Sequence, residues 1–539
     1  MPRTHRLWVA IAVATLLPLG SATARTIEVD AATIADINAA FDAGTLTSEA
    51  LTRMCLARID AFDRNGPTLH AVIFLNPRAL EQARALDAER RAKGRRSPLH
   101  GIPVVLKDNY DTFDMPTTGG SILLEGSIPS KDAFVVKKLR DAGAIILAKV
   151  NMSEFASGGT YSSLGGQSLN PHDLTRGPSG SSGGTGVAIA AAYAVIGMGT
   201  DTGGSIRGPA TTNGIAALKP THGLLSRSGI IPLALSFDTG GPMARSVFDV
   251  AAALGIMTGV DAADPATAKS EAKFQTGYTA GLRVDALNGA RIGVARDFMG
   301  ADPDVDWVME AAFSAMRKAG ATLVDVRYPK WLLDVKGEFY TAIRYPEFAV
   351  QIAEYLKGTG PKYPKTLAEM IERANQFTGT RGDGARPNPS RWTLFKREVE
   401  AGSMTDYRYT AVHDYGLPMV RAVVEGMFEA QQLDAIVYPT ASRRPSLITA
   451  TAGAGTTVAS ALSASGLGAT DVANLTGFPD LIVPAGFTGD SLPVGLSFFG
   501  RAFGESKLLS LGYSFEQATK ARRRPVHTPA LPGGTISMP

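Results

Sequence analysis

The sequence predicts an α/β protein with a mixed, mainly parallel central sheet, helices on both faces of the sheet, and a helical insertion. Short apolar runs, such as Val104–Leu106, are typical of strands that are buried on both faces. Amphipathic helical segments separate these runs, and the alternation of strand, helix and strand favours βαβ units. A chain of 539 residues with 45% apolar residues can fill a large core. We expect one domain over residues 25–539.

The first half of the chain supplies the first βαβ pattern. Helical spacing runs over 32–62 and ends at "DRNGP"; a strand over 71–76 and a charged amphipathic helix over 77–93 follow. The run 104–106 then leads directly into Lys107, and a helix over 132–140 precedes the apolar strand "AGAIILAKVN" at 142–151. Two neighbouring buried strands thus each end near a lysine.

The second half continues the pattern around a polar segment. A serine- and glycine-rich loop, 176–186, precedes an alanine-rich helix. The strand "AVIGMG" follows this helix and ends where "GTDTGGSIRG" begins, at 199–208. Further strands are expected at 291–295, 433–441, 480–487 and 493–500, and a last helix at 506–520. Amphipathic helices with a Pro- and Gly-rich break fill about 304–430, which we interpret as an insertion or cap within the same domain.

The N-terminus has the pattern of a secretory signal peptide. Arg3 and Arg6 precede an apolar run, 7–19, and then "SATA", so cleavage is expected after Ala24. This apolar run is shorter than the roughly 20 residues that span a bilayer. We therefore expect a soluble exported protein, periplasmic or secreted, with no membrane partner after cleavage.

Composition excludes several classes of function. The net charge of +4 falls to +2 without the two arginines of residues 1–24, which is too small to indicate a nucleic-acid partner. The single cysteine, Cys55, lies on an apolar helical face, and no histidine pair has metal-ligand spacing. The glycine-rich loops lack the spacing of phosphate-binding motifs. We expect no metal, no organic cofactor, and a monomer or homodimer.

Ser205, within "GTDTGGSIRG", is the candidate nucleophile. It lacks the G-x-S-x-G turn of a Ser-His-Asp hydrolase, although a distant histidine base stays possible from the sequence. A buried lysine with a lowered pKa can serve as the base instead, and Lys107 stands at the end of a buried strand. A hydroxyl from the serine-rich loop at 179–182 would relay the proton between them.

The chain resembles the amidase signature family. The resemblance is carried by "GSSGGTGVAIAAAYAVIGMGTDTGGSIRGPATTNGIAALKPTHG" at 180–223, by "GIPVVLKDN" and "SFDTGGPMARSV", and more loosely by "GFPDLIVPAGF" and "LPVGLSFFG". Several separate motifs in the same order cover most of the chain beyond residue 24. Among exported members of this family, the chain resembles peptide amidases in its signal peptide, its length and the segments "SFDTGGPMARSV" and "ESKLLSLGYSFEQAT". The family's fold is the expected one.

The resemblance also implies roles for individual residues. Ser205 would be the acylated nucleophile, Lys107 the base, and Ser181 the bridging serine after a cis peptide bond, because the family places that serine 24 residues before the nucleophile. Backbone N–H groups near Ser205 would hold the oxyanion. The implied oxyanion and substrate-binding residues are Thr202, Gly203, Gly204 and Ser182, and the supporting residues that brace the loop by ion pairing are Asp201 and Arg207.

These residues predict hydrolysis of a linear amide through an acyl-enzyme. Peptide amides and small aliphatic or aryl amides are the expected substrates. Three alternatives stay open: an esterase or carbamate hydrolase with the same mechanism, an amidotransferase component, and a catalytically silent binding protein.

Overall fold

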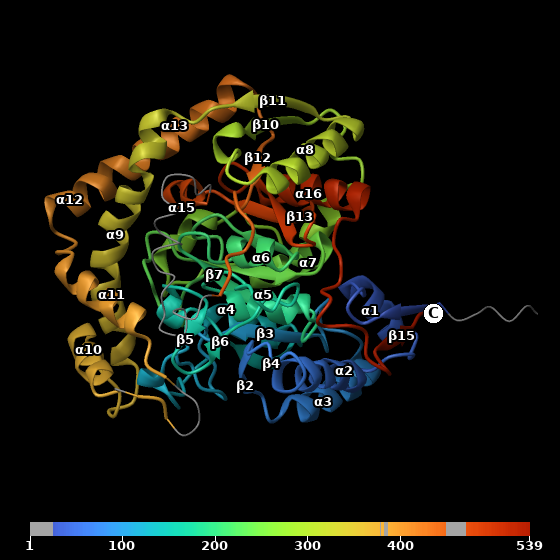
Figure 1. Ribbon diagram of the computed structural model, residues 1–539. Coiled ribbons are helices and arrows are strands. Elements are labelled where there is room, and N and C mark those ends of the chain that lie inside the picture. Colours follow the sequence, from blue (N-terminus) through green and yellow to red (C-terminus); the bar gives the residue numbers. More distant parts are fainter. Residues whose placement is uncertain (1–24, 378, 382–385, 449–469) are drawn as a thin grey trace, which may run out of the picture.

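A mixed sheet of eleven strands forms the centre of the molecule (Figure 1). The computed structural model describes residues 25–377, 379–381, 386–448 and 470–539, so the predicted signal peptide lies outside the described residues. The strand order is β11-β10-β12-β14-β13-β8-β9-β7-β3-β4-β2. The strands are β2 (Val72–Leu75), β3 (Pro103–Lys107), β4 (Ile145–Val150), β7 (Ile196–Asp201), β8 (Ala216–Lys219), β9 (Thr239–Ala244), β10 (Arg291–Ala295), β11 (Thr322–Val326), β12 (Ala435–Pro439), β13 (Asp480–Phe487) and β14 (Pro493–Phe499).

The α/β class and the mixed sheet are as predicted, but parallel pairing is less extensive than expected. Within the described sheet, β7, β3 and β4 run parallel, as do β12, β10 and β11, which makes four parallel pairs of ten. The pairs around β8, β9, β13 and β14 are antiparallel. The expectation of a mainly parallel sheet is wrong: six of the ten pairs are antiparallel, of which three involve β8 or β9, two strands that the sequence does not predict. Two short pairs lie outside this sheet, β1 (Thr26–Glu28) with β15 (Thr535–Ser537) and β5 (Tyr161–Ser162) with β6 (Gly166–Gln167).

Helices cover both faces of the sheet. Val104 and Leu106 of β3 belong to one apolar cluster and Val105 to another, because successive residues of a strand point to opposite faces. The first cluster includes α1 (Ile34–Asp42), α4 (Phe134–Asp141), α7 (Val247–Met257), α8 (Pro303–Lys318) and α16 (Glu505–Thr519). The second includes α2 (Ser48–Ile59), α3 (Ala79–Lys93), α5 (Gly183–Ala190) and α6 (Arg207–Thr212). The helix expected over 32–62 is divided, since Thr47 caps a new helix at Ser48.

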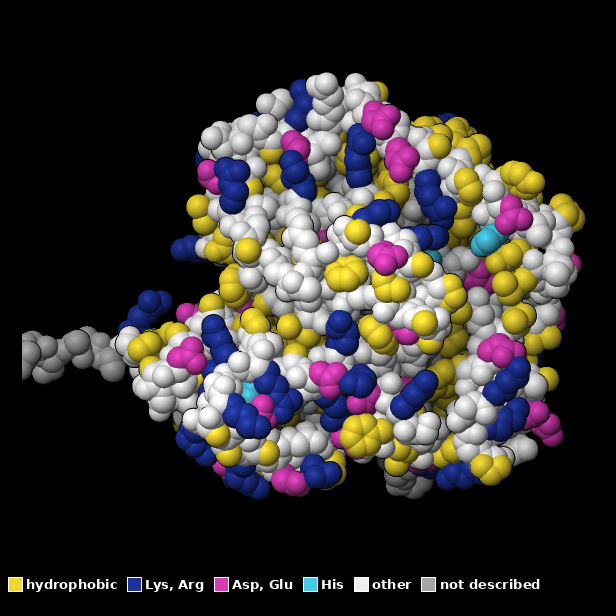
Figure 2. All heavy atoms as spheres, turned by 180° about the vertical axis from the view of Figure 1, so that it is seen from behind, with side chains coloured by type: hydrophobic (Ala, Val, Ile, Leu, Met, Phe, Trp, Pro, Cys, Tyr) yellow, Lys and Arg dark blue, Asp and Glu magenta, His cyan; other side chains and the backbone are white. Residues whose placement is uncertain are grey.

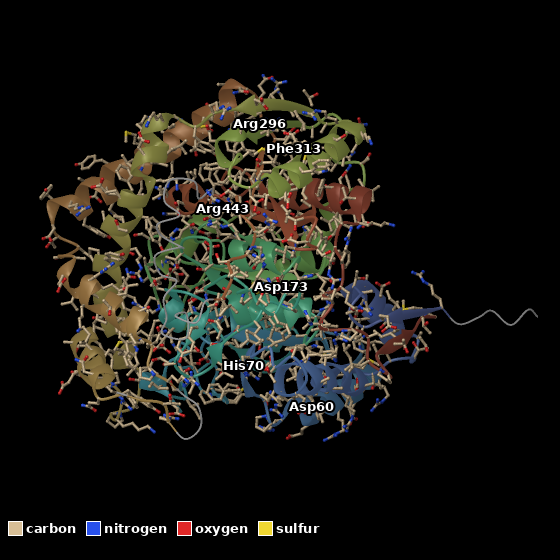
Figure 3. The ribbon with its side chains drawn as sticks, in the orientation of Figure 1. Asp60, His70, Asp173, Arg296, Phe313 and Arg443 are labelled. Carbon is tan, nitrogen blue, oxygen red and sulfur yellow. The ribbon has the colours of Figure 1, made fainter. Side chains whose placement is uncertain are left out.

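A group of helices, which we call the helical arm, lies along one side of the sheet, at the left of Figure 1. It consists of α9 (Lys330–Lys357), α10 (Leu367–Asn375), α11 (Pro389–Glu400), α12 (Tyr407–Thr410) and α13 (Leu417–Ala430). The predicted range 304–430 is therefore not an insertion throughout, because α8 and the edge strand β11 within it belong to the sheet layers. Arg296, after β10, contacts α8: its guanidinium carbon lies 5.5 Å from the centroid of the Phe313 ring. Both residues are labelled in Figure 3.

Charged side chains of both signs are interspersed on the face shown in Figure 2. This distribution gives no single-sign field on that face that would attract a polyanion. Among the described helices, none is both long and apolar enough to span a membrane.

Candidate active site

The parallel strands β3 and β7 bring the candidate catalytic groups to one edge of the sheet. Lys107 is the last residue of β3 and Asp201 the last of β7, and the carboxyl ends of neighbouring parallel strands lie side by side. Lys107 Nζ lies 2.7 Å from Ser181 Oγ and 2.8 Å from Thr200 Oγ1. The base and the bridging serine that the sequence suggested are thus in direct contact.

Lys107 is fully buried, and this burial changes its protonation. Loss of solvation lowers the pKa of its ammonium group to about 7, against the opposing effects of the Asp201 and Asp238 carboxylates. A substantial fraction of the amine is therefore neutral at physiological pH, with a lone pair that can accept a proton.

Ser181 lies on the loop before α5, and the peptide bond between Gly180 and Ser181 is cis, as the resemblance implies. The Ser153 backbone N–H donates to the Ser181 carbonyl at 3.0 Å, and the Ser182 N–H donates to the Ser205 carbonyl at 3.1 Å. The second of these bonds joins the serine-rich loop directly to the loop that carries the candidate nucleophile.

Ser205 lies between β7 and α6 and is partly exposed. Its hydroxyl makes no hydrogen bond to the described part of the chain, so the bond to Ser181 that a complete relay needs is not formed in this structure. Within the same residues, no histidine is hydrogen-bonded to Ser205. The contact of Ser205 with the serine-rich loop is the hydrogen bond that its carbonyl accepts from the Ser182 N–H.

Asp201 and Arg207 form the expected ion pair, with 3.0 Å between Arg207 Nη2 and Asp201 Oδ1, and both are fully buried. Asp201 also accepts hydrogen bonds from the N–H groups of Gly204 and Ile206, at 2.8 and 2.9 Å. Although burial opposes it, the Arg207 charge with these hydrogen bonds holds the pKa of Asp201 well below its usual range. Arg207 Nη1 also forms an ion pair with Asp480 Oδ2 at 3.1 Å, and this pair joins the loop to β13.

Replacing Asp201 with asparagine should destabilise the protein by about 3–5 kcal/mol at pH 7, because it leaves the buried Arg207 short of a charge partner. Because the pKa of Asp201 is lowered in the folded protein, its ionised carboxylate stabilises the fold fully above the unfolded carboxyl's pKa of about 3.9. That contribution to the free energy of unfolding is lost as the pH falls below this value. Urea denaturation at pH 7 and pH 3 measures both effects. Equal denaturation midpoints for the two proteins at pH 7 would contradict this role for Asp201.

The backbone donors differ from those expected. The Gly204 N–H, one of the predicted oxyanion donors, donates to Asp201 Oδ1 at 2.8 Å and is not free for an anion in this structure. The N–H groups of Gly203 and Ser205 have no acceptor in the described residues and stay free to bind an anion. Ser182 Oγ accepts from the Thr200 N–H at 3.3 Å and donates to the Thr200 carbonyl at 3.2 Å, which braces β7 and leaves the hydroxyl committed. The Thr202 hydroxyl donates to Asp238 at 2.5 Å.

Gly204 adopts a conformation that requires glycine, with φ of +109°. A Cβ there would lie 2.8 Å from Thr470 Oγ1. Gly204→Ala should displace the loop and lower kcat/KM about 100-fold, since small displacements of a catalytic group have effects of this size. Gly277→Ala is the matched control, because Gly277 has a negative φ and open space around it. Steady-state kinetics of the two variants test this, and equal rates would refute the requirement for glycine at 204.

A small cavity of about 10 Å³, room for about one water molecule, lies beside Thr200 and Thr202. Four aliphatic side chains line it, namely Ile230, Ile231, Leu233 and Leu235, together with polar groups that include Asn109, Arg227 and Asp238. Burial raises the pKa of Asp238 to about 6, although Thr202 and two backbone N–H groups donate to it. The cavity wall thus combines aliphatic side chains with charged, amide and hydroxyl groups.

Sequence reasoning missed several groups that hold the site together. Thr200 contacts Lys107, and Asn109 Nδ2 donates to Thr200 Oγ1 at 3.0 Å. Asn474 and Asp480 bind the Asp201–Arg207 pair from the far end of the chain. The available signal is the presence of polar residues beside apolar ones. Asn109 in "KDN" comes two residues after Lys107, and Asn474 and Asp480 begin and end "NLTGFPD". Within the described residues, no cluster of three or more His, Cys, Asp or Glu could hold a metal ion.

Comparison with known proteins places this geometry in context. The Amidase family model matches residues 50–509. The chain is 36% identical to a glutamyl-tRNA(Gln) amidotransferase subunit of Chloroflexus aurantiacus, over 90% of this chain and 96% of that one. It is 33% identical to a probable amidase of Arabidopsis thaliana, over 95% of each. The structure of native peptide amidase from Stenotrophomonas maltophilia matches with a TM-score of 0.81 and 37% identity, over 92% of this chain and 99% of that one.

Proposed function

Because the chain belongs to the amidase family and is an amidohydrolase, we propose that it cleaves linear carboxylic amides through an acyl-enzyme on Ser205. The observation that carries this proposal is the contact of a buried lysine, whose pKa is lowered to about 7, with Ser181 at 2.7 Å. Ser182, next to Ser181, is hydrogen-bonded to the backbone of Ser205. Lysine, bridging serine and nucleophile thus occupy adjoining positions.

In the proposed mechanism, neutral Lys107 accepts the Ser181 hydroxyl proton while Ser181 takes the proton of Ser205. Ser205 Oγ attacks the amide carbonyl carbon, and the free N–H groups of Gly203 and Ser205 stabilise the oxyanion. Collapse of the tetrahedral intermediate breaks the C–N bond, and the relay returns the proton to the leaving nitrogen as ammonia or an amine. Water, deprotonated by the same relay, then hydrolyses the ester on Ser205.

Peptide amides are the substrates that we favour, together with small aliphatic and aryl amides. The small cavity beside Thr202 presents four aliphatic side chains against which an apolar group of the substrate can pack. The similarity of the fold to peptide amidase supports the same choice. Esters and carbamates are the alternative, since they can acylate the same serine.

The proposal is tested with a substrate panel and a covalent probe. The protein without residues 1–24 should hydrolyse peptide amides, with release of ammonia, faster than it hydrolyses fatty amides, aryl amides, esters or carbamates. A fluorophosphonate should label Ser205, which tryptic mass spectrometry locates. A protein that hydrolyses esters or carbamates but no amide would make the alternative correct, and an unlabelled, inactive protein would indicate a binding function.

We also propose that residues 1–24 direct export, on the strength of the charged, apolar and small-residue pattern of that segment. N-terminal sequencing of the protein recovered from a bacterial periplasm tests this. Arg25 as the first residue is the expected result, and recovery of the uncleaved chain from the cytoplasm would contradict it.

A further inference from the structure

Tyr340, in α9 of the helical arm, lies against the loop that carries Ser205. An ideal Cβ on Gly203 would lie 3.0 Å from Tyr340 Oη and 3.0 Å from Cζ, so the ring contacts the loop backbone two residues before the nucleophile. The ring also stacks on Phe237, with 5.5 Å between ring centroids and 16° between planes. Two contacts on different segments therefore fix where the phenol ring lies.

The Tyr340 hydroxyl is available to a ligand. It makes no hydrogen bond to the described residues, and the side chain is 8% exposed. The hydroxyl of Tyr328, in the same apolar cluster, is also unpartnered but is sealed from solvent. Burial raises the pKa of Tyr340 well above its ordinary value, so the phenol stays neutral and able to donate. An unpartnered polar group costs free energy unless a bound molecule satisfies it.

The face of α9 that carries Tyr340 also hydrogen-bonds to the segment that contains Leu235, a residue of the cavity wall. Glu347 and Gln351, seven and eleven residues later, lie on that same helical face. Glu347 Oε2 accepts from the Ser236 N–H, and Gln351 Oε1 accepts from the Leu235 N–H, both at 2.9 Å. One rigid helix thus sets the distance between an uncommitted hydroxyl and the aliphatic cavity that Leu235 lines.

We propose that the Tyr340 hydroxyl hydrogen-bonds the substrate and selects amides that carry a second hydrogen-bonding group beside the scissile amide. An N-acyl amino-acid amide fits this requirement, because its N-acyl amide supplies the second hydrogen-bonding group for Tyr340. A simple alkyl amide would leave the hydroxyl unpaired in the complex and should therefore be the poorer substrate. The inference rests on the proposed amide hydrolysis at Ser205.

The test compares N-acetyl-leucinamide with 4-methylpentanamide, which has the same side chain and scissile amide but no N-acyl group. Tyr340→Phe keeps the ring and removes only the hydroxyl. It should lower kcat/KM about ten-fold for N-acetyl-leucinamide and less than two-fold for 4-methylpentanamide, as expected for one neutral hydrogen bond. Tyr328→Phe is the matched control and should change neither value, because its hydroxyl is sealed in the core.

The outcomes separate the two proposals. A wild-type protein that hydrolyses neither amide and is not labelled at Ser205 contradicts the proposed function itself. If the wild type is active and labelled, a Tyr340→Phe variant with unchanged rates, or with equal losses on both amides, overturns the role of Tyr340 alone. The rate of fluorophosphonate labelling of Tyr340→Phe should equal that of wild type, which shows that the nucleophile loop is intact.

Discussion

Ser205→Ala should lower turnover of a good peptide amide by roughly a millionfold, the size of loss that follows removal of a serine nucleophile. The hydroxyl forms no hydrogen bond to the described residues, so its loss leaves the surrounding network intact. Stability of the variant should therefore be within about 0.5 kcal/mol of wild type. Single-turnover kinetics measure the first effect and urea denaturation the second.

The neighbouring Ser182 supplies the control. Ser182→Ala removes a hydroxyl that braces Thr200, so we expect a moderate loss of rate with fluorophosphonate labelling retained at Ser205. Intact amide hydrolysis by the Ser205→Ala variant would show that another group is acylated.

Lys107→Met should lower kcat/KM roughly 10⁴-fold, at the upper end of general-base effects. The sign of the pH dependence follows from the lowered pKa of about 7: only the neutral amine accepts a proton, so the kcat/KM of wild type should rise as the pH increases through 7 and then level off. An activity that falls over this range would contradict a lysine base.

Stability should depend on pH through the same group. The folded pKa of about 7 lies below the unfolded value of about 10.4, so the unfolded chain binds more protons between these pH values. Wild type should gain stability as the pH rises from 7 towards 10. Lys107→Met should lose this part of the pH dependence and be at least as stable as wild type at pH 7.

Lys219 gives a matched control for this experiment. It is equally buried, in β8, and its pKa is also lowered to about 7 by desolvation, but its Nζ donates to the carbonyls of Pro220 and Phe478. Lys219→Met should therefore keep the rise of kcat/KM with pH. If that rise disappears in Lys219→Met and persists in Lys107→Met, the base has been assigned to the wrong lysine.

The sequence predicted the strands that are richest in apolar residues. It also predicted that the site lies at the end of the buried strand that carries Lys107. It did not predict β8 and β9, because "AALK" is short and "TGGPMA" contains two glycines and a proline, which are rare in strands. Those two strands form antiparallel pairs between the halves of the sheet. The five residues between β13 and β14, typical of a hairpin, were a signal for antiparallel pairing that could have been used.

For the site, a lysine at the end of a buried strand was predictable, but its geometry depends on contacts that no local pattern encodes. The Lys107 contact with Thr200 arises from the parallel register of β3 and β7. The occupation of the Gly204 N–H by Asp201 depends on the shape of one loop. Tyr340 reaches Gly203 from a helix about 140 residues further along the chain.

The anchoring of Arg207 to Asn474 and Asp480 has a consequence for biosynthesis. The loop that carries Ser205 is complete only when residues from the last quarter of the chain have joined it. A growing chain that has passed residue 205 but not residue 480 has all three candidate catalytic groups without the charges that hold the nucleophile loop in place. Amide hydrolysis should therefore begin only when synthesis is nearly finished, so the nascent polypeptide stays inert.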